Sequence, residues 1–254
     1  MRIAVITGAT SGIGYEAALE ADSRFKSLDE IWVIGRNTTK LEELSEHITH
    51  SVRTFSMDLT SEEDLKNFEN ILAGTKPEIK LLFQSAGCGL HGKFERMKRK
   101  DETDIIRLNC EALTAMTSIC LPYMHAKSHI ILVSSAAAFC PFPGYSVYSA
   151  SKSYVLNFAR SLRAELRKRK IVVTAVCPGP VNTPFFSISE RYTNGVSIQK
   201  RKLMASPRKV ARKALFDAYL HRMVSVNSPL VGLFRIIAKL MPHGILVNLV
   251  KLLG

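Results

Sequence analysis

A tyrosine, a lysine and a serine in the middle of the chain have the types and the spacing of a proton-transfer site. Tyr148 and Lys152 are four residues apart, and Ser135 lies thirteen residues before the tyrosine. In a helix, a four-residue spacing places the phenol and the ammonium on the same face. A phenol keeps its proton until about pH 10, and a neighbouring ammonium favours the phenolate and lowers that pKa. Tyr148 could then exchange a proton with an alcohol or carbonyl oxygen that the Ser135 hydroxyl holds.

Taken alone, a Tyr-x-x-x-Lys pair also occurs on ordinary surface helices, so the surrounding elements decide its meaning. Apolar runs that predict strands cover residues 3–7, 31–35, 54–57, 81–85, 130–134, 171–177 and 223–226. Helical patterns lie between them, at 12–23, 39–48, 61–72, 101–124, 148–168 and 207–220. Apolar strands that alternate with helices indicate a parallel sheet covered on both faces. We predict a doubly wound α/β domain of about seven strands that binds its ligands beyond their carboxyl ends.

The composition is typical of one globular domain in a reducing compartment. The chain has 254 residues, 46% of them hydrophobic, which suits a single large core. The odd number of cysteines and the lack of a C-x-x-C pair suggest neither a disulfide framework nor a zinc site. The first strand begins at Ile3, which leaves no room for a signal peptide. We therefore expect a cytoplasmic protein.

Positive charge is concentrated in the C-terminal part. Residues 1–162 carry 18 basic and 19 acidic side chains, whereas residues 163–254 carry 17 basic and 3 acidic ones. Such asymmetry indicates either an anionic partner or a basic surface that aids solubility. Because no nucleic-acid-reading motif accompanies the charge, no nucleic-acid partner is expected.

A glycine-rich loop joins the first predicted strand to the first predicted helix. Its sequence is Thr7-Gly8-Ala9-Thr10-Ser11-Gly12-Ile13-Gly14. Gly8 allows a tight turn, Gly12 lets backbone approach a pyrophosphate, and Gly14 permits close helix–strand packing. The helix N-terminus adds N–H donors and the positive end of its dipole. This context predicts a dinucleotide site.

The second strand indicates which dinucleotide is bound. An acid at its end would hold the ribose 2′-hydroxyl of NAD, whereas an arginine accommodates the 2′-phosphate of NADP. This strand ends with Gly35-Arg36-Asn37 and has no acid there, so NADP(H) is predicted. Asp58, after the third strand, is interpreted either as a contact to the adenine amino group or as an ordinary turn residue.

Over residues 1–228 the chain resembles the classical short-chain dehydrogenases/reductases. The glycine loop, Asn109, Ser135 and the Tyr148-x-x-x-Lys152 pair occur in the family's order. The segment after the sixth strand also matches, at Pro178-Gly179, Val181 and Thr183. The resemblance implies a Rossmann-type oxidoreductase, a dimer or tetramer of identical chains, and a substrate loop at 181–206. One departure is Ser85-Ala86-Gly87 in place of the family's Asn-Ala-Gly, which puts the support of the fourth strand in doubt.

The resemblance also implies a role for each matched residue. Tyr148 would be the acid in reduction and the base in oxidation, and Lys152 would lower its pKa. Ser135 would polarise the substrate oxygen, with Ser134 the weaker candidate, and Asn109 would position a water relay. No metal is expected, because the nicotinamide supplies the hydride. The predicted cofactor site comprises Thr7, Gly8, Ser11, Gly12, Ile13, Gly14, Arg36, Asp58, Leu59, Ala86, Gly87, Tyr148, Lys152, Pro178, Gly179, Val181 and Thr183.

Aromatic residues are frequent near the expected substrate side. Those predicted to line the pocket are Phe139, Phe142, Tyr145, Phe185, Phe186 and Tyr192. They favour a steroid-like or other lipid-like carbonyl compound, although the same rings could be loop anchors packed on the core. An acyl-carrier 3-oxoacyl thioester is the alternative substrate. A further alternative is a non-catalytic cofactor-sensing or membrane-associated protein, which would have no need of Tyr148 and Lys152.

Residues 229–254 form a tail beyond the last strand. The pattern predicts two short amphipathic helices separated by Pro242-His243-Gly244. Charges interrupt it well short of the ~20 apolar residues that a membrane span requires. The tail is interpreted as a lid over the substrate pocket, an oligomer contact, or a segment that lies on an anionic membrane surface.

Overall fold

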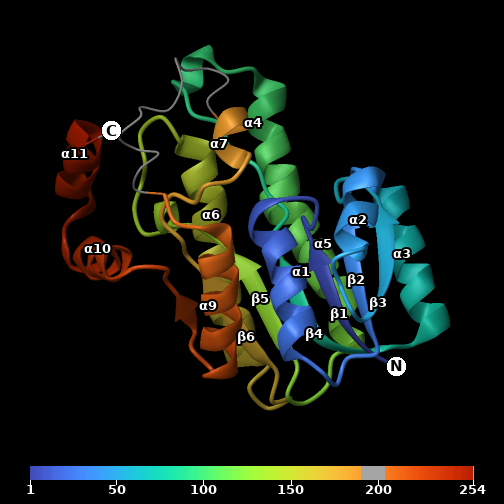
Figure 1. The fold of residues 1–254 in the computed structure, drawn as a ribbon. Helices are drawn as coiled ribbons and strands as arrows, with labels where there is room; N and C mark the ends of the chain where they lie inside the picture. The colour runs from blue at the N-terminus through green and yellow to red at the C-terminus, as the bar shows by residue number, and fades with distance from the viewer. Residues whose placement is uncertain (190–203, 254) are drawn as a thin grey trace.

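The computed structural model describes residues 1–189 and 204–253 and contains a seven-stranded sheet. The strands are β1 (Arg2–Thr7), β2 (Glu30–Gly35), β3 (Ser51–Ser56), β4 (Glu78–Gln84), β5 (His129–Val133), β6 (Val172–Val176) and β7 (Val224–Ser225). Their order is β3-β2-β1-β4-β5-β6-β7, and every neighbouring pair is parallel (Figure 1). The predicted Rossmann-type sheet is confirmed.

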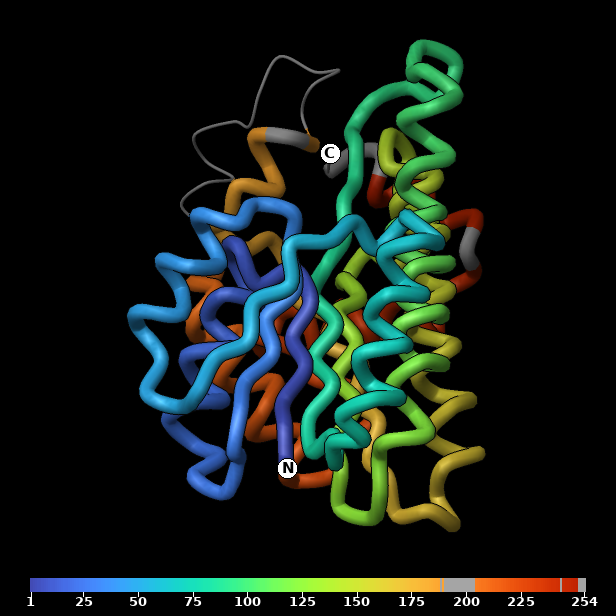
Figure 2. Tube along the Cα trace, turned by 90° about the vertical axis from the view of Figure 1, so that its right-hand side faces the viewer, coloured from blue at the N-terminus to red at the C-terminus, as the bar shows by residue number. Residues whose placement is uncertain are grey.

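Helices cover both faces of the sheet. One layer contains α1 (Gly12–Arg24), α2 (Thr38–Ser45) and α9 (Pro207–Tyr219), and the other contains α3 (Glu62–Thr75), α5 (Leu113–Cys120) and α6 (Ser146–Glu165). Figure 2 shows the blue and orange elements on one side of the sheet and the cyan, green and olive ones on the other. The molecule therefore has three layers and two apolar cores.

The strands are apolar on both faces because each face packs against a helix layer. In β1, Ile3 and Val5 belong to the core under α3, α5 and α6, whereas Ala4 and Ile6 belong to the core under α1, α2 and α9. Successive side chains of a strand point to opposite faces. This explains the near-continuous apolar runs from which the strands are predicted.

The region expected to be one helix over 101–124 is divided. It consists of α4 (Arg99–Ile106), a π-helical turn (Arg107–Ala112), α5, and a short 3₁₀ turn (Leu121–Tyr123). The segment is helical without a break over residues 99–123, as predicted, but it is not α-helical throughout. A π turn accommodates an extra residue and rotates the side chains around it, and Asn109 lies within this one.

The C-terminal tail forms α10 (Pro229–Leu240) and α11 (His243–Leu253). A small apolar cluster of Cys140, Ala238, Leu246 and Val250 joins these helices to the loop after β5. Among the helices of residues 1–189 and 204–253, we find none with the length and apolarity needed to cross a membrane.

Candidate active site

The predicted site residues gather at the carboxyl ends of β1, β4, β5 and β6. The chain leaves β1 for β2 on one side, while β4 lies on the other. A reversal of this kind opens a crevice at the strand ends, where doubly wound proteins bind ligands. The glycine loop follows β1 directly, and Ser135 follows β5 after one residue.

The three glycines of the glycine-rich loop have no room for side chains. Gly8 and Gly12 have φ values of +68° and +58°, in the left-handed region that favours glycine. A Cβ atom on Gly14 would lie 2.3 Å from the Gly8 carbonyl oxygen. Ser11 is the N-cap of α1, and within the described part of the chain its hydroxyl makes no capping bond. Backbone N–H groups at this helix start can therefore meet a diphosphate.

The adjoining turn after β4 is tied to the glycine loop. The Ala86 N–H donates to Thr7 Oγ1 over 3.3 Å, and a Cβ atom on Gly8 would lie 2.7 Å from the Ala86 nitrogen. Ile13, in the first turn of α1, packs against the apolar core under α1, α2 and α9. The two strand ends that border the crevice are thus held in register.

Arg36 and Asp58 mark the end of the crevice where an adenosine would lie. Arg36 is exposed directly after β2. Asp58 accepts hydrogen bonds from the Thr60 N–H and hydroxyl at 2.9 and 2.8 Å. The Thr60 backbone bond lowers the pKa of Asp58 most strongly, burial opposes this, and the Arg36 charge lowers the pKa further. Leu59 is buried beneath them. Arg36 and Asp58 thus lie close enough for the charge of one to act on the other.

The segment after β6 forms the opposite lip of the crevice. A Cβ atom on Gly12 would lie 2.9 Å from Thr183 Cγ2, so Thr183 lies against the glycine loop. Val181 is buried, and the Gly179 N–H donates to Asn227 Oδ1 over 3.0 Å. The Pro178 carbonyl accepts from the Ala136 N–H over 2.8 Å. This lip is therefore bonded to the turn that presents Ser135.

Ser135, Tyr148 and Lys152 come together from two elements. Ser135 caps a 3₁₀ turn (Ala136–Ala138), and its Oγ accepts from the Ala137 N–H over 3.1 Å. Tyr148 and Lys152 lie one turn apart on α6, with the Lys152 nitrogen 5.8 Å from the centre of the tyrosine ring. A Cβ atom on Gly87 would lie 3.1 Å from that nitrogen. The three predicted catalytic side chains thus border the crevice at one place.

The protonation of this group differs from the expectation. Burial raises the pKa of Tyr148 to about 12, although a hydrogen bond with Ser135 lowers it. Burial also lowers the pKa of Lys152 to about 8. The spacing predicted that the lysine would lower the pKa of the phenol toward the neutral range. In this arrangement the pKa of Tyr148 is raised instead. The Lys152 ammonium donates to the Val133 carbonyl over 3.0 Å. Burial is therefore the main influence on the pKa of the Tyr148 phenol.

Asn109 is buried and fully engaged. Its Oδ1 accepts from the Cys88 N–H at 2.9 Å, and its Nδ2 donates to the Cys88 carbonyl at 2.8 Å. The same Nδ2 donates to Ser151 Oγ at 2.9 Å, and Ser151 donates to the Tyr148 carbonyl at 2.7 Å. Asn109 thus connects the strand end after β4 with the helix that carries Tyr148.

Two supporting residues escaped the prediction. Ser151 lies inside the Tyr-Ser-Ala-Ser-Lys segment, whose spacing drew attention only to its ends. Gln84 lies one residue before Ser85, and its Nε2 donates to the Leu113 carbonyl at 3.1 Å and to Thr117 Oγ1 at 2.7 Å. This buried carboxamide joins β4 to α5, so the fourth strand has a support that does not depend on Ser85. Ser134 is buried, and its hydroxyl donates to the Lys152 carbonyl at 2.7 Å.

Aromatic rings pack around Tyr148. The ring centres of Tyr145 and Phe185 lie 5.6 and 5.5 Å from that of Tyr148, and Phe186 meets Phe185 edge-on. His91 stacks on Tyr145 with ring centres 4.5 Å apart and was not among the predicted residues. These rings give the tyrosine an apolar, aromatic surrounding.

The remaining predicted pocket residues lie elsewhere. Phe139 and Phe142 pack against the cluster that holds the tail, and the Phe139 ring lies 6.3 Å from that of Phe234 on α10. For these two rings the structure supports the loop-anchor interpretation. Tyr192 and the 190–203 part of the expected substrate loop lie outside the described residues.

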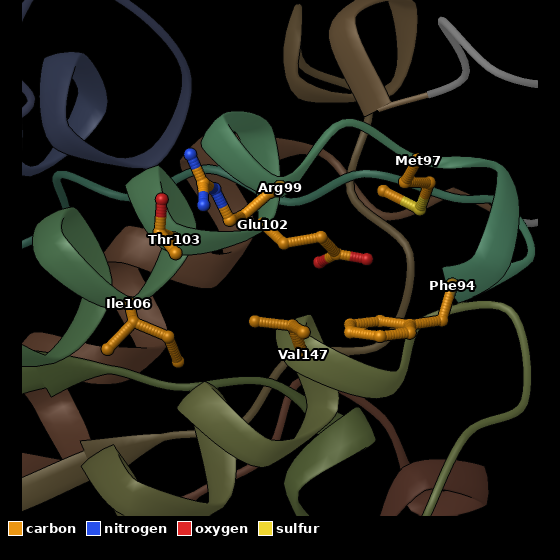
Figure 3. Close-up of a pocket in the computed structure, with 7 residues that line it drawn as sticks. All are labelled: Phe94, Met97, Arg99, Glu102, Thr103, Ile106 and Val147. Atoms are coloured by element: carbon orange, nitrogen blue, oxygen red, sulfur yellow. The ribbon is translucent and has the colours of Figure 1, made fainter.

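A separate hollow of about 380 Å³ lies beside the N-terminus of α6. Figure 3 shows the side chains that face it from α4, from α6 and from the turn before α4. They are Phe94, Met97, Arg99, Glu102, Thr103, Ile106 and Val147. None of these residues was predicted to be part of the site, although Val147 precedes Tyr148.

Comparisons with known proteins agree with this geometry. The family model described as short chain dehydrogenase matches residues 2–192. A very-long-chain 3-oxoacyl-CoA reductase from Anas platyrhynchos is 33% identical over 198 residues, which cover 74% of this chain and 62% of that protein.

Solved structures share the fold. A Burkholderia phymatum short chain dehydrogenase/reductase in complex with NAD has a TM-score of 0.80 at 19% identity, covering 93% of this chain and 92% of that one. A Sphingobium yanoikuyae short-chain dehydrogenase in complex with NADPH has a TM-score of 0.78 at 23% identity, covering 95% and 97%. With the family model matched over most of its length, this chain belongs to the short-chain dehydrogenase/reductase family of oxidoreductases.

Proposed function

We propose that this protein is an NADP(H)-dependent oxidoreductase that interconverts a hydrophobic ketone and a secondary alcohol. The observation that carries the proposal is the meeting of Ser135, Tyr148 and Lys152 beside the glycine loop. The two hydroxyls supply donors for a carbonyl oxygen, and the loop supplies a site for a dinucleotide next to them.

The crevice fits a nicotinamide dinucleotide. A Cβ atom on Gly8 or Gly14 would collide with protein backbone atoms, so glycine at both positions lets the chain turn tightly into α1, where backbone N–H groups can approach the diphosphate. Arg36 would hold the 2′-phosphate and Thr183 the carboxamide, while Tyr148 and Lys152 would meet the nicotinamide ribose. When bound, the nicotinamide would supply hydride for reduction and accept it in oxidation.

The side chains of the protein would manage the proton. In reduction, Ser135 donates a hydrogen bond to the carbonyl oxygen, and Tyr148 transfers its phenolic proton to that oxygen as the C–H bond forms. The raised pKa of Tyr148 keeps this proton in place until transfer. The Lys152 ammonium then stabilises the resulting phenolate. Oxidation follows the same steps in reverse, with the phenolate as the base.

The apolar substrate class is supported by the rings around the phenol. Tyr145 and Phe185 offer aromatic surface beside Tyr148, and Phe186 extends it. A second candidate substrate is a long-chain 3-oxoacyl thioester, favoured by the identity of 33% to a protein named for that reaction.

A paired variant and a substrate screen test the proposal. Tyr148→Phe should lower turnover by about 10²-fold or more while NADPH binding, measured by calorimetry, stays close to wild type. Tyr154→Phe is the matched control, since Tyr154 lies on the same helix and is half exposed. NADPH oxidation would be screened against steroid ketones, long-chain 3-oxoacyl thioesters and small polar aldehydes. Substantial turnover by Tyr148→Phe would overturn the mechanism, and a preference for the polar aldehydes would overturn the substrate class.

A further inference from the structure

The two tail helices expose an apolar surface that the proposed reaction does not use. We call it the tail surface; it consists of Leu230, Leu233, Ile236, Ile237, Leu240, Ile245 and Leu249, which are between 38% and 78% exposed. On α10 these residues recur every three or four positions, which aligns them in one stripe. Figure 1 shows α10 and α11 at the left edge of the molecule, outside the helix layers.

The opposite faces of the same helices are anchored. Ala238 on α10 and Leu246 and Val250 on α11 are buried against Cys140, and the Phe234 ring meets Phe139. Ser228 caps α10 by accepting from the Val231 N–H over 3.3 Å. The stripe therefore belongs to folded helices with a defined inner and outer face.

The charges around the tail surface have one sign. The two helices contain Arg235, Lys239 and Lys251 and no acidic residue. Asp217 is the single acid between residues 204 and 253, and it is buried between Lys213 and Arg222, with nitrogen–oxygen distances of 2.9 Å to each. An apolar stripe on helices whose charged residues are all basic is complementary to an apolar layer with negative groups at its surface.

A second copy of the chain fits this surface less well. Joining two such faces would bring like charges together, which disfavours association. All seven residues are leucine or isoleucine, whereas the residues that dominate protein interfaces are tryptophan, tyrosine and arginine. A basic helix with an aliphatic face is typical of segments that lie in the plane of a membrane surface.

We propose that α10 and α11 lie flat on a bilayer that contains anionic phospholipid. Leu233, Ile236 and Leu240 enter the boundary between headgroups and acyl chains, and Lys239 meets the lipid phosphates. The proposal concerns attachment of the protein and holds whatever carbonyl compound it reduces.

Vesicle flotation of the full chain tests the proposal. Wild-type protein should float with phosphatidylcholine vesicles that contain about 30% phosphatidylglycerol and float much less with pure phosphatidylcholine. The triple variant Leu233→Ser, Ile236→Ser, Leu240→Ser should lose flotation. The matched control replaces Phe216, Tyr219 and Leu220 by serine. These apolar residues lie on α9 and directly after it, are exposed to a similar degree, and lie outside the tail surface. Circular dichroism checks that both variants fold.

A charge variant distinguishes electrostatic binding to anionic lipid from unspecific apolar adsorption to vesicles. Lys239→Glu should weaken binding to the anionic vesicles by about fivefold or more, while Lys66→Glu, an exposed position on α3, should leave it unchanged. Failure of the wild type to float with anionic vesicles would overturn the proposal, as would equal flotation of the tail and control triple variants. If light scattering showed instead a wild-type oligomer that only the tail variant dissociates, without flotation, a second copy would be the occupant.

Discussion

The Lys152 ammonium donates to the backbone carbonyl of Val133 across 3.0 Å. Val133 is the last residue of β5, two positions before Ser135. The lysine is thus fixed to the strand that presents the serine, while its own helix presents the tyrosine. This contact joins the strand that leads to Ser135 to the helix that carries Tyr148 and Lys152.

The protonation of Lys152 should govern the pH profile of reduction. Burial lowers its pKa to about 8, so the ammonium is lost as the pH rises through that value, and the phenolate left after proton transfer loses its stabilising charge. Tyr148 remains protonated throughout, since its pKa is raised to about 12. We expect kcat/KM, measured between about pH 6 and pH 10, to fall above about pH 8. In Lys152→Arg the fall should move to higher pH, and a wild-type profile without a fall would contradict the assignment.

Asn109→Ala should reduce both stability and turnover. The change leaves the N–H and the carbonyl of Cys88 without their side-chain partner, and each buried unpaired group costs about 1–3 kcal/mol. Urea denaturation would measure the free energy of unfolding, and NADPH oxidation would measure kcat. Asn157→Ala, at an exposed position on α6, is the control and should change neither. Equal behaviour of the two variants would show that the Asn109 network has no importance.

Arg36→Ala should weaken NADPH binding much more than NADH binding. A charge-assisted contact to the 2′-phosphate contributes about 1.5–3 kcal/mol, so the KM for NADPH should rise by about tenfold or more. The KM for NADH should stay nearly constant because that cofactor lacks the phosphate. Lys40→Ala, nearby on α2 and exposed, is the control. Equal increases for both cofactors would contradict NADP selection by Arg36.

Two glycine substitutions should have opposite effects on stability. A Cβ atom at Gly14 would lie 2.3 Å from the Gly8 carbonyl oxygen, so Gly14→Ala must displace α1 and should cost about 1–3 kcal/mol, with weaker cofactor binding. Gly74, near the end of α3, has open space where its Cβ would lie. Gly74→Ala should therefore stabilise the fold by about 0.4–1 kcal/mol. Thermal unfolding and cofactor titration would measure both, and a neutral Gly14→Ala would disprove the packing argument.

The sheet could be predicted from the sequence because its strands are buried on both faces. A short apolar run such as 130–134 is typical of a strand that is buried on both faces. The structure has β5 there, at His129–Val133. The site residues that the structure brings together were found through spacing and order, since Ser135, Tyr148 and Lys152 lie close in the sequence. Their roles and the cofactor preference stay predictions.

The parts that escaped prediction depend on contacts between distant segments. The π turn around Asn109 cannot be predicted from the spacing of apolar residues. Asn109 bonds to Cys88, which lies 21 residues away in the sequence. Gln84 reads as an ordinary strand residue until α5 is placed beside it. The pKa of Tyr148 was expected to fall because the sequence shows a neighbouring lysine, whereas the depth of burial that raises it exists only in the folded protein.

The hydrogen bond from the Ala136 N–H to the Pro178 carbonyl limits how this protein could be re-engineered. The bond ties the turn around Ser135 to the segment that leads to Thr183, so a shift of one should move the other. A lip transplanted from a relative should shift the serine unless the 135–138 turn were transplanted with it. We therefore expect the proposed carboxamide contact at Thr183 and the proposed carbonyl contact at Ser135 to change together.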